Sequence, residues 1–411
     1  MKLLLSAYAC EPGVGSEPGK GWNMAREMAK YHEVWVLTWS GRRPGIEMEI
    51  ARNPVPNLHA IYYGWPGDRL WRGGIGLYLH YYLWQIAAYF VARQLHREIN
   101  FDLVHHISYA SYWMPSFLPL LPVPFVWGPV GGGESAPKTF RPDFSWWGKA
   151  YELLRDLSQW LGEANPFVRL ALQRSAVVLV PTEDTAQRLR SLGRQDVQVF
   201  LHTALPEEEI SCLGQYKLPE SNPIRFISIG RLLHWKGFHL GLRAFAAAKL
   251  DGAEYWIIGD GAESKRLQRL ARDLGIASQV KFWGKLPRDE TLRKLGECHV
   301  LVHPSLHDSG GTGCLEAMLA GRPVICLDLG GPAILIAQET GYKIPAQDPE
   351  RAVQDLAESM TRLALDPKLR VSLGQAAQKR GSEIFSWNVK GKFYNQLYEE
   401  ILAKRTSQQI I

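Results

Sequence analysis

The sequence predicts an α/β fold of two doubly wound domains that face each other across a cleft. Its 411 residues are too many for one ordinary hydrophobic core. Apolar, strand-like runs alternate with helical stretches in each half, which is typical of parallel sheets covered by helices. A polar stretch with two prolines, residues 205–222, separates the halves and is predicted to be the linker.

The first half, residues 1–204, contains six strand-like runs with helical stretches between them. Because parallel strands end at the same edge of a sheet, ligands are expected beyond their carboxyl ends. Strands are predicted in KLLLSAY, EVWVLTW, LHAIYY, DLVHHI, PFVWG and AVVLVP, and helices at 19–31, 75–98, 147–161 and 183–191.

The alternation begins again in the second half, residues 223–385. The last helix, 386–404, carries an aromatic and aliphatic face at helical spacing, so we expect it to pack back on the first domain. Strands are predicted in IRFISIG, EYWIIG, VKFWG, VLVHPS and PVICLD, with helices near 237–250, at 263–274 and from 313 onward.

Charge and cysteine content narrow the class of partner. The net charge is +6, but basic residues are dispersed, so nucleic acid is not indicated and an anionic small molecule or membrane surface fits at least as well. The five cysteines form no CxxC pair, which favours a reduced, cytoplasmic protein. No DxD motif and no His/Cys cluster is present, so no metal site is expected.

Three aromatic stretches of the first half indicate contact with a membrane. Residues 75–92 carry no charge, but His80 and Gln85 interrupt them, and the aromatic rings are spread throughout. This favours a surface or core helix over a spanning one. With GWPGDRLWRGG (Trp65, Arg69, Trp71 and Arg72) and SWWGKAYELLRDLSQWLG, the stretch predicts peripheral attachment to the inner face of a membrane; a sugar-stacking groove or plain core is the alternative.

The stretch HDSGGTGCLEAMLAGRPVI, residues 307–325, places small residues between two carboxylates, Asp308 and Glu316. Glycines ahead of a helix expose backbone N–H groups to an anion, which indicates a phosphate cradle. Carboxylates would repel a phosphate and suit sugar hydroxyls instead. Together they indicate a ligand with a sugar on each side of a diphosphate, as in a nucleotide-sugar. The cradle comprises Gly310, Gly311, Thr312 and Gly313.

This stretch resembles the E-x7-E motif of retaining GT-B glycosyltransferases of the family 4 type. GRLLHWKG, residues 230–237, is similar to the family's phosphate-binding segment, and WIIGDGAESKRLQRLARDLGI, VKFWGKL and VLVHPS follow in the family's order. The resemblance is strong over 223–380 and looser before it. It implies a GT-B fold and retaining transfer of a sugar, a hexose, from a nucleotide-sugar to a hydroxyl acceptor, with no metal and no cofactor.

The resemblance also implies roles for the matching residues. Glu316 would hold the ribose hydroxyls, and Asp308, at the family's first glutamate position, would face hydroxyls of the donor sugar. Aspartate is one methylene shorter than glutamate, so this departure bears on donor identity. Arg231 and Lys236 would lie on the diphosphate and neutralise charge on the leaving group. Backbone groups around Gly284 and Lys285 would hold the base.

The loop ACEPGVGSEPGKGW follows the first strand and resembles a dinucleotide fingerprint only in part. Its third glycine is displaced, and no acid follows the second strand, which argues against an NAD site. The family resemblance instead places Gly13 and Gly15 near the donor and Ser16 and Glu17 on the acceptor side.

Two histidines end the strand DLVHHI, and only one of them can face the cleft because side chains alternate along a strand. We expect His106 to be the catalytic one and place His105 on the acceptor side, although the assignment could be reversed. Gly131 and Gly132, in the next glycine-rich strand exit, are also placed on the acceptor side.

Two other functions fit much of this pattern. A GT-B relative with different chemistry, such as a phosphorylase or a nucleotide-sugar epimerase, would share the phosphate cradle. A non-catalytic nucleotide-sugar-binding subunit would also share it. The intact set of motifs favours the transferase, with a lipid-linked or envelope or exopolysaccharide glycan intermediate as the expected acceptor.

Overall fold

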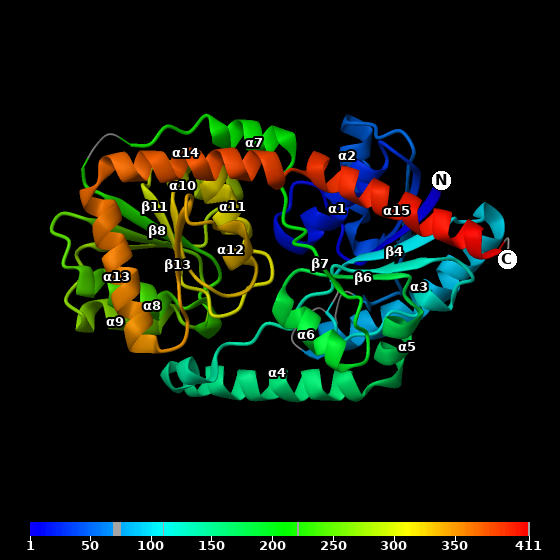
Figure 1. Cartoon of the computed structure of the whole chain (residues 1–411), viewed down its shortest axis with the longest axis horizontal. Helices are drawn as coiled ribbons and strands as arrows, with labels where there is room; N and C mark the ends of the chain where they lie inside the picture. Colours follow the sequence, from blue (N-terminus) through cyan, green and yellow to red (C-terminus); the bar gives the residue numbers. More distant parts are fainter. Residues whose placement is uncertain (69–74, 110, 220–221, 410–411) are drawn as a thin grey trace. The chain divides into compact units, whose positions relative to one another are not determined.

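The computed structural model describes residues 1–68, 75–109, 111–219 and 222–409 (Figure 1). Arg69, Trp71 and Arg72, which belong to a predicted membrane-contacting stretch, lie outside these residues. The chain forms two compact units. The first unit is Met1–Gly133, Asp156–His202 and Trp387–Ile411, and the second is Glu134–Arg155 and Thr203–Ser386.

Among the described residues, the first unit has a seven-stranded parallel sheet in the order β3-β2-β1-β4-β5-β6-β7. All six strands predicted for this half are present, and β7 is added at one edge. The strands are β1 (Lys2–Ala7), β2 (Glu33–Trp39), β3 (Leu58–Tyr63), β4 (Leu103–Ser108), β5 (Phe125–Trp127), β6 (Val177–Val180) and β7 (Gln198–Val199).

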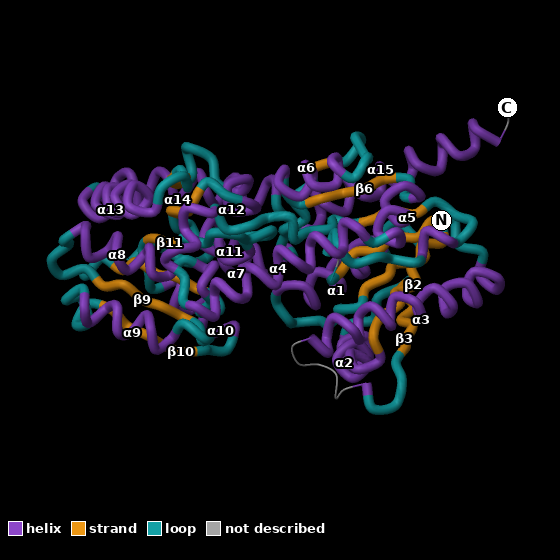
Figure 2. The backbone as a smooth tube through the Cα atoms, turned by 90° about the horizontal axis from the view of Figure 1, so that it is seen from below, coloured by secondary structure: helices purple, strands orange, loops and turns teal. Residues whose placement is uncertain are grey.

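Helices lie on the faces of this sheet, which is why β1 and β4 are buried almost throughout (Figure 2). α15 clusters with the first unit, although it follows the second in sequence. The helices are α1 (Ser16–Met28), α2 (Arg43–Arg52), α3 (Ile75–Ile99), the part of α4 (Trp146–Ala164) from Asp156 onward, α5 (Pro166–Arg174), α6 (Glu183–Ser191) and α15 (Trp387–Gln409).

The uncharged stretch 75–92 lies in α3 and contributes to the hydrophobic core. Tyr81, Trp84, Ala88 and Ala92 recur at helical spacing and are buried. Its polar His80 is also buried, and its Nδ1 lies 2.8 Å from the hydroxyl of Tyr8. Among the residues that the structure describes, no helix is long and apolar enough to cross a membrane.

The second unit has a parallel sheet of six strands within the described chain, in the order β10-β9-β8-β11-β12-β13. The five strands predicted for this half are present, and β13 is a further edge strand. The strands are β8 (Arg225–Ile229), β9 (Glu254–Ile258), β10 (Val280–Gly284), β11 (Val300–His303), β12 (Val324–Leu327) and β13 (Gly341–Ile344).

Residues 205–222, predicted to be a linker, contain α7 and cluster with the second unit, as do residues 134–155. Three consecutive glutamates in the first turn of α7 favour a helix start, because they face the positive end of its dipole. The helices of this unit are α7 (Glu207–Gly214), α8 (Phe238–Ala248), α9 (Ser264–Asp273), α10 (Arg288–Gly296), α11 (Thr312–Leu319), α12 (Gly330–Leu335), α13 (Pro349–Leu365) and α14 (Pro367–Ile384).

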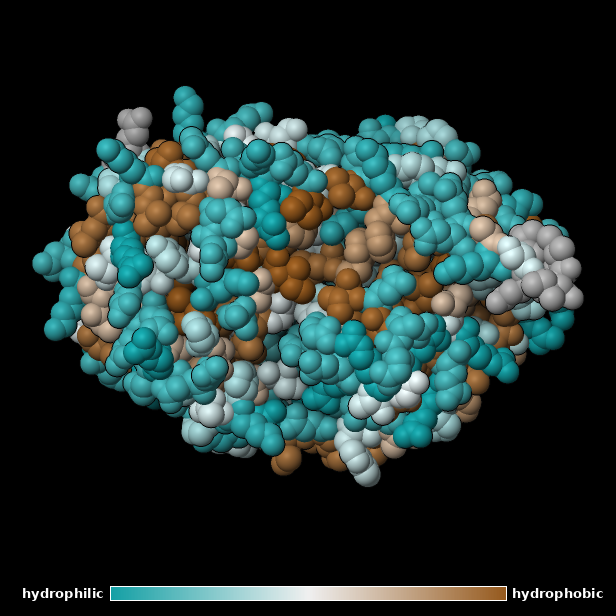
Figure 3. Space-filling view, viewed as in Figure 1, coloured by the Kyte–Doolittle hydropathy of each residue, from teal (hydrophilic) through white to brown (hydrophobic). Residues whose placement is uncertain are grey.

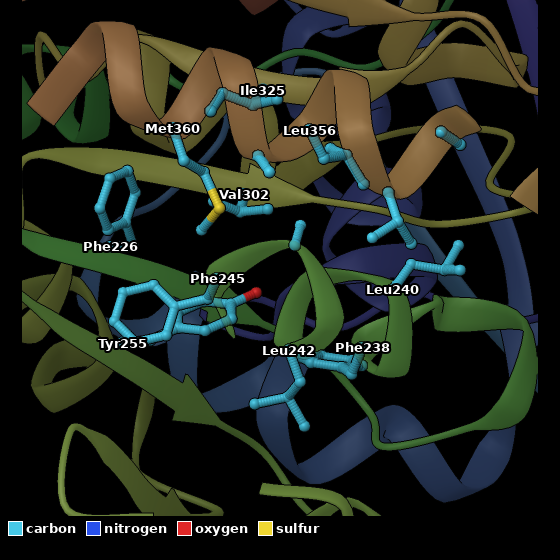
Figure 4. Packing of buried hydrophobic residues seen from close by; sticks show 14 of the residues in the cluster. Phe226, Phe238, Leu240, Leu242, Phe245, Tyr255, Val302, Ile325, Leu356 and Met360 are labelled. Atoms are coloured by element: carbon cyan, nitrogen blue, oxygen red, sulfur yellow. The ribbon is translucent and has the colours of Figure 1, made fainter. Parts of the chain in front are cut away.

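The core of the second unit gathers around α8 and α13 (Figure 4). Phe226 and Tyr255 come from neighbouring strands, Phe245 from α8 and Met360 from α13, and all four are buried. The Tyr255 hydroxyl lies 2.7 Å from Ser228 Oγ, so the one polar atom that this ring brings into the core has a partner.

The loops that leave β8 and β11 approach each other closely at Gly237. This residue has φ +67°, and a Cβ atom there would lie 1.8 Å from the carbonyl oxygen of Pro304. Gly237 is therefore required both for its left-handed backbone and for the space that a methyl group would take.

We expect Gly237→Ala to lower the free energy of unfolding by about 2–4 kcal/mol, because left-handed strain and overpacking add. Gly252→Ala is the matched control: its φ is +70°, and a Cβ atom there would meet nothing within 4 Å. The control should lose roughly 1–2 kcal/mol from strain alone. Urea denaturation of both variants measures the difference, and equal losses would contradict the close-approach argument.

Candidate functional site

The chain order reverses at the same point in both sheets. β1 lies between β2 and β4, and β8 lies between β9 and β11. In open α/β sheets the carboxyl ends of strands at such a switch point form the ligand crevice. The predicted donor residues Arg231, Lys236 and Asp308 lie in the loops after β8 and β11 of the second unit.

Lys236 and Asp308 join these two loops. Lys236 Nζ lies 2.5 Å from Asp308 Oδ2, and the two side chains are about one-fifth exposed, at 21% and 18%. Arg231 in the same loop is exposed. The structure therefore brings an ammonium, a guanidinium and a carboxylate to the carboxyl edge of adjacent strands.

Asp308 accepts four hydrogen bonds from the chain itself. Its Oδ1 accepts from the amides of Gly310 and Gly311 at 3.1 and 3.0 Å, and its Oδ2 accepts from Lys236 at 2.5 Å and lies 3.2 Å from His303 Nε2. Burial alone would raise the pKa of Asp308, but the charge of Lys236 and the His303 hydrogen bond hold it well below its ordinary value. All four lone-pair directions of this carboxylate are in use.

Fewer amides are therefore available to an anion in the predicted phosphate cradle than the sequence indicated. Because the amides of Gly310 and Gly311 donate to Asp308, the amides at the start of α11, Thr312 and Gly313, are the ones placed for an anion. Gly311 has φ +70° and caps this helix, and a Cβ atom at Gly313 would meet nothing within 4 Å.

Glu316 lies one turn further along α11 and is buried. Its Oε1 accepts from Arg288 Nη1 at 2.6 Å, and Arg288 Nη2 donates to Glu209 Oε2 at 2.5 Å. Burial raises the pKa of Glu316 above its ordinary value, although the charge of Arg288 opposes that shift. Sequence reasoning missed Arg288 and Glu209, since no spacing or motif connects α10 or α7 with Glu316.

Gly284 ends β10 at the same edge of the sheet, and Lys285 follows it. Gly284 has φ +68°, and its carbonyl oxygen accepts from the amide of Gly259 at 2.8 Å. Lys285 is exposed. Their predicted contact with a nucleotide base stays a prediction.

In the first unit, Glu17 connects the first turn of α1 with the loop after β4. Its side chain pairs with Lys20 on α1, and its Oε2 accepts from the amide of Tyr109 at 2.9 Å. Burial alone would raise the pKa of Glu17, but Lys20 and the Tyr109 amide lower it below its ordinary value. Gly13 has φ +69°, Gly15 caps α1 and Ser16 is its first residue; the side chain of Ser16 lies outside what the structure describes.

His105 and His106 are both buried but contact different elements. His105 Nε2 donates to the carbonyl oxygen of Gly128 at 2.6 Å, so its Nδ1 accepts from Tyr398 of α15, also at 2.6 Å. Burial lowers the pKa of His105 to about 3, so its ring is neutral at physiological pH. It ties β4 to α15 within the first unit.

His106 contacts α3 and β1 instead. Its Nε2 lies 3.0 Å from the hydroxyl of Tyr81, and its Nδ1 lies 3.3 Å from Ser6 Oγ. Burial lowers its pKa to about 4, and the nearby charge of Glu17 opposes that shift. Both ring nitrogens therefore have partners, and a catalytic role for His106 stays a prediction.

Gly131 and Gly132 help to organise the loop after β5. The Gly131 carbonyl accepts from the amide of Tyr112 at 3.1 Å, and the Gly132 carbonyl accepts from Gln159 Nε2 at 2.9 Å. Gly132 has φ +95°, and a Cβ atom there would lie 2.3 Å from the ring of Trp113. Their predicted acceptor-side role is not visible in these contacts.

The loops after β8 and β11, which carry the predicted donor residues, are called the donor loops. Glu152 of α4, a carboxylate that the sequence did not single out, joins them. Its Oε1 lies 3.0 Å from Nε2 of His234 in the loop after β8 and 3.5 Å from Nε2 of His307 in the loop after β11. Trp235 stacks on His307 at 5.1 Å between ring centroids. Burial alone would raise the pKa of Glu152, but the histidine hydrogen bonds lower it to about 2.

Known families match nearly the whole length of the chain. The family described as "Glycosyl transferases group 1" matches residues 215–380, and the "Glycosyl transferase 4-like domain" matches residues 22–202. The chain belongs to the glycosyltransferases of the family 4 type. Within the described residues, no group of three or more His, Cys, Asp or Glu side chains could hold a metal ion.

Two glycosyltransferases are similar in sequence to part of this chain. The 2-deoxystreptamine glucosyltransferase of Streptomyces kanamyceticus is 25% identical over 62% of this chain and 65% of its own. The lipopolysaccharide core biosynthesis glycosyltransferase LpsE of Rhizobium meliloti is 28% identical over 56% of this chain and 64% of its own. The matched region thus spans less than two thirds of either relative.

The fold is that of the GT-B glycosyltransferases. The crystal structure of Anabaena HepE in complex with UDP and glucose has a TM-score of 0.60 to this chain. It is 17% identical in sequence, and the match covers 97% of this chain and 100% of that one. At that identity the likeness establishes the fold alone.

We expect Glu152→Gln to weaken binding of the predicted nucleotide-sugar donor about tenfold, because the charge-assisted hydrogen bond between His234 and Glu152 of α4 is lost. Glu163→Gln is the matched control. Glu163 also lies on α4 and pairs with Arg188 at 3.0 Å, but it contacts neither donor loop. Donor affinity is measured by calorimetry beside the thermal midpoint of each variant. A loss of the same size in both variants would show a general effect of α4.

Proposed function

We propose that this chain transfers a sugar from a nucleotide-sugar donor to a hydroxyl acceptor. The observation that carries the proposal is the joining of Lys236 and Asp308 at the switch point of the second sheet, with Glu316 one turn beyond on α11. A diphosphate needs cations and exposed amides, and the sugars on either side of it need carboxylates. HepE, in complex with UDP and glucose, has the same fold.

Lys236 and Arg231 are the groups that neutralise charge on the leaving diphosphate. An ammonium has three N–H donors, so Lys236 can keep its bond to Asp308 while it donates to phosphate oxygens. The exposed guanidinium of Arg231 can bind two phosphate oxygens at once. As the bond to the sugar breaks, charge grows on the diphosphate, and both cations then stabilise the transition state more than the ground state.

Asp308 has a second role in this proposal. Because its oxygens hold two loop amides and Lys236, it fixes the shape of the loop before the donor arrives. A sugar hydroxyl that binds Asp308 has to replace or share one of those bonds. As the bond between the sugar and the diphosphate breaks, the acceptor hydroxyl attacks the same face of the sugar and gives its proton to the departing diphosphate, which retains the anomeric configuration.

The acceptor that we propose is a lipid-linked or envelope glycan intermediate, met at the inner face of a membrane. The name of LpsE, a lipopolysaccharide core glycosyltransferase, supports a glycan acceptor of the cell envelope. The net charge of +6 and the exposed aromatic side chains of α4 support peripheral membrane attachment. The 2-deoxystreptamine glucosyltransferase supports sugar transfer more broadly.

The deciding experiment offers the purified chain UDP-, GDP- and ADP-sugars with membrane lipid extracts as acceptors. Release of nucleotide that depends on the acceptor, with the sugar recovered on lipid, is the expected result. Sugar transferred to inorganic phosphate would indicate a phosphorylase, and an isomerised donor would indicate an epimerase. Nucleotide binding without turnover on any acceptor would indicate a non-catalytic subunit. Proton NMR of the product then reads its anomeric configuration.

Glu316→Gln should weaken nucleotide binding about tenfold, because an amide binds ribose hydroxyls and Arg288 less strongly than a carboxylate. The matched control is Glu254→Gln in β9, which pairs with Lys281 at 2.8 Å and Arg225 at 3.3 Å. Thermal shifts with UDP, GDP and ADP measure the affinities. Near-normal affinity in the Glu316 variant would rule out the ribose assignment.

For Lys236→Ala we expect kcat to fall about a hundredfold or more, with a smaller rise in KM, because leaving-group charge is greatest in the transition state. Lys281→Ala, which removes an exposed lysine paired with Glu254, should leave both constants unchanged. A change confined to KM in the Lys236 variant would mean that this lysine only binds the donor.

A further inference from the structure

Helix α4 is amphipathic in the reverse of the usual sense. Its small and polar residues Gly148, Glu152, Gln159 and Gly162 are buried. Its large apolar residues are exposed, and they recur at the three- and four-residue spacing of one helix face. They are Trp146 (65% exposed), Trp147 (67%), Leu153 (71%), Leu154 (62%), Leu157 (48%), Trp160 (63%) and Leu161 (55%).

Contacts of the inner face fix this orientation. In the second unit, Glu152 lies 3.0 Å from His234, and a Cβ atom at Gly148 would lie 2.8 Å from the same ring. In the first unit, Gln159 donates to Gly132, and a Cβ atom at Gly162 would lie 2.3 Å from Trp113. Only glycine and these polar groups fit inward, so the apolar face cannot rotate into the core.

The exposed face is free of negative charge. α4 is described throughout, and none of its three acidic residues, Glu152, Asp156 and Glu163, is exposed. Lys149 on the edge of the face is exposed, as is Arg169 on α5, the helix that follows. Figure 3 shows apolar surface along the lower margin, where Figure 1 draws α4.

The apolar surface continues within the first unit. Phe167 of α5 is partly exposed and lies 5.2 Å from Phe117 between ring centroids. Phe117 in turn lies 6.0 Å from Tyr82 of α3. Beyond these rings, the exposed apolar residues of α3 are Tyr78, Leu79, Leu83 and Phe90.

We propose that the outer face of α4 is a docking surface for an anionic lipid bilayer, with the helix lying in the plane of the interface. The inference rests on the membrane attachment in the proposed function and assigns the surface that makes it. Trp146 and Trp147 in the first turn and Trp160 in the second half of the helix suit the headgroup level, and the leucines suit the acyl boundary. Lys149 and Arg169 attract anionic headgroups.

Charge favours lipid over a second copy of the chain. In a symmetric dimer built on this face, each surface would meet its own copy. Lys149 and Arg169 of both copies would then lie at one interface, and α4 has no exposed acidic residue to offset their charge. A bilayer supplies the opposite charge and needs no complementary shape, which suits a single convex helix.

The test is flotation of the full chain with vesicles of equal parts phosphatidylcholine and phosphatidylglycerol. Leu153→Glu combined with Leu157→Glu places two charges in the centre of the outer face and should reduce vesicle binding at least tenfold. Leu365→Glu is the matched control, because Leu365 at the end of α13 is 74% exposed against 71% for Leu153. The control should float like the wild type, and high salt should weaken wild-type binding.

Thermal shifts with UDP, GDP and ADP show whether all three proteins are folded and bind nucleotide equally. Flotation of the double variant at the wild-type level would overturn the α4 assignment and leave membrane attachment standing. Absence of wild-type flotation would overturn both statements, while acceptor-dependent nucleotide release would still support the transferase. A wild-type dimer that the double variant converts to a monomer, with no vesicle binding, would overturn the inference in favour of a second copy.

Discussion

The ion pair between Lys236 and Asp308 is the contact on which the carboxyl edge of the second sheet depends, where the donor is predicted to bind. It joins the loops that leave β8 and β11, and the same carboxylate holds the amides of Gly310 and Gly311. Breaking a largely buried pair by removing one partner typically costs about 3–5 kcal/mol, because the other charge is left uncompensated. The pair therefore sets the loop geometry before any ligand binds. It also keeps an ammonium, with donors to spare, at the place where a diphosphate is expected.

Around this pair, the second unit uses carboxylates to hold a guanidinium and two histidines in place. Glu316 and Glu209 hold the guanidinium of Arg288 from two sides, and Glu152 receives one histidine from each donor loop. Electrostatic catalysis depends on such groups being oriented in advance, since reorientation during the reaction would cost free energy. The need to orient these groups also explains why the inner face of α4 is polar where Glu152 contacts the two loops. Its apolar residues are then left to the outer face.

Much of the fold follows from the sequence, because strands buried on both faces give continuous apolar runs. β1, β4, β8 and β11 were all predicted, as were α3 and α4 to within a few residues. The edge strands β7 and β13 were not, since β7 is exposed and β13 is only partly buried, so neither gives a continuous apolar run. α7 was read as a linker because prolines flank it, although three glutamates favour a helix there. Within the site, the motifs singled out Arg231, Lys236, Asp308 and Glu316. The sequence could not single out Arg288, Glu209 or Glu152, which reach the site from other helices.

What the sequence determined by itself is local: periodicity, glycine positions and the order of motifs that marks a family 4 glycosyltransferase. It determined that His105 and His106 point to opposite sides of β4, since side chains alternate along a strand. Only the tertiary structure decided that His105 binds Tyr398, far along the chain on α15, while His106 contacts Tyr81. Likewise, the sequence left the aromatic stretch of α4 open between membrane contact, a groove and core, and only the tertiary structure showed that its apolar side chains are exposed. A helical pattern separates two faces and does not say which one meets the protein. That depends on contacts such as Glu152 with His234, which join residues brought together by folding alone.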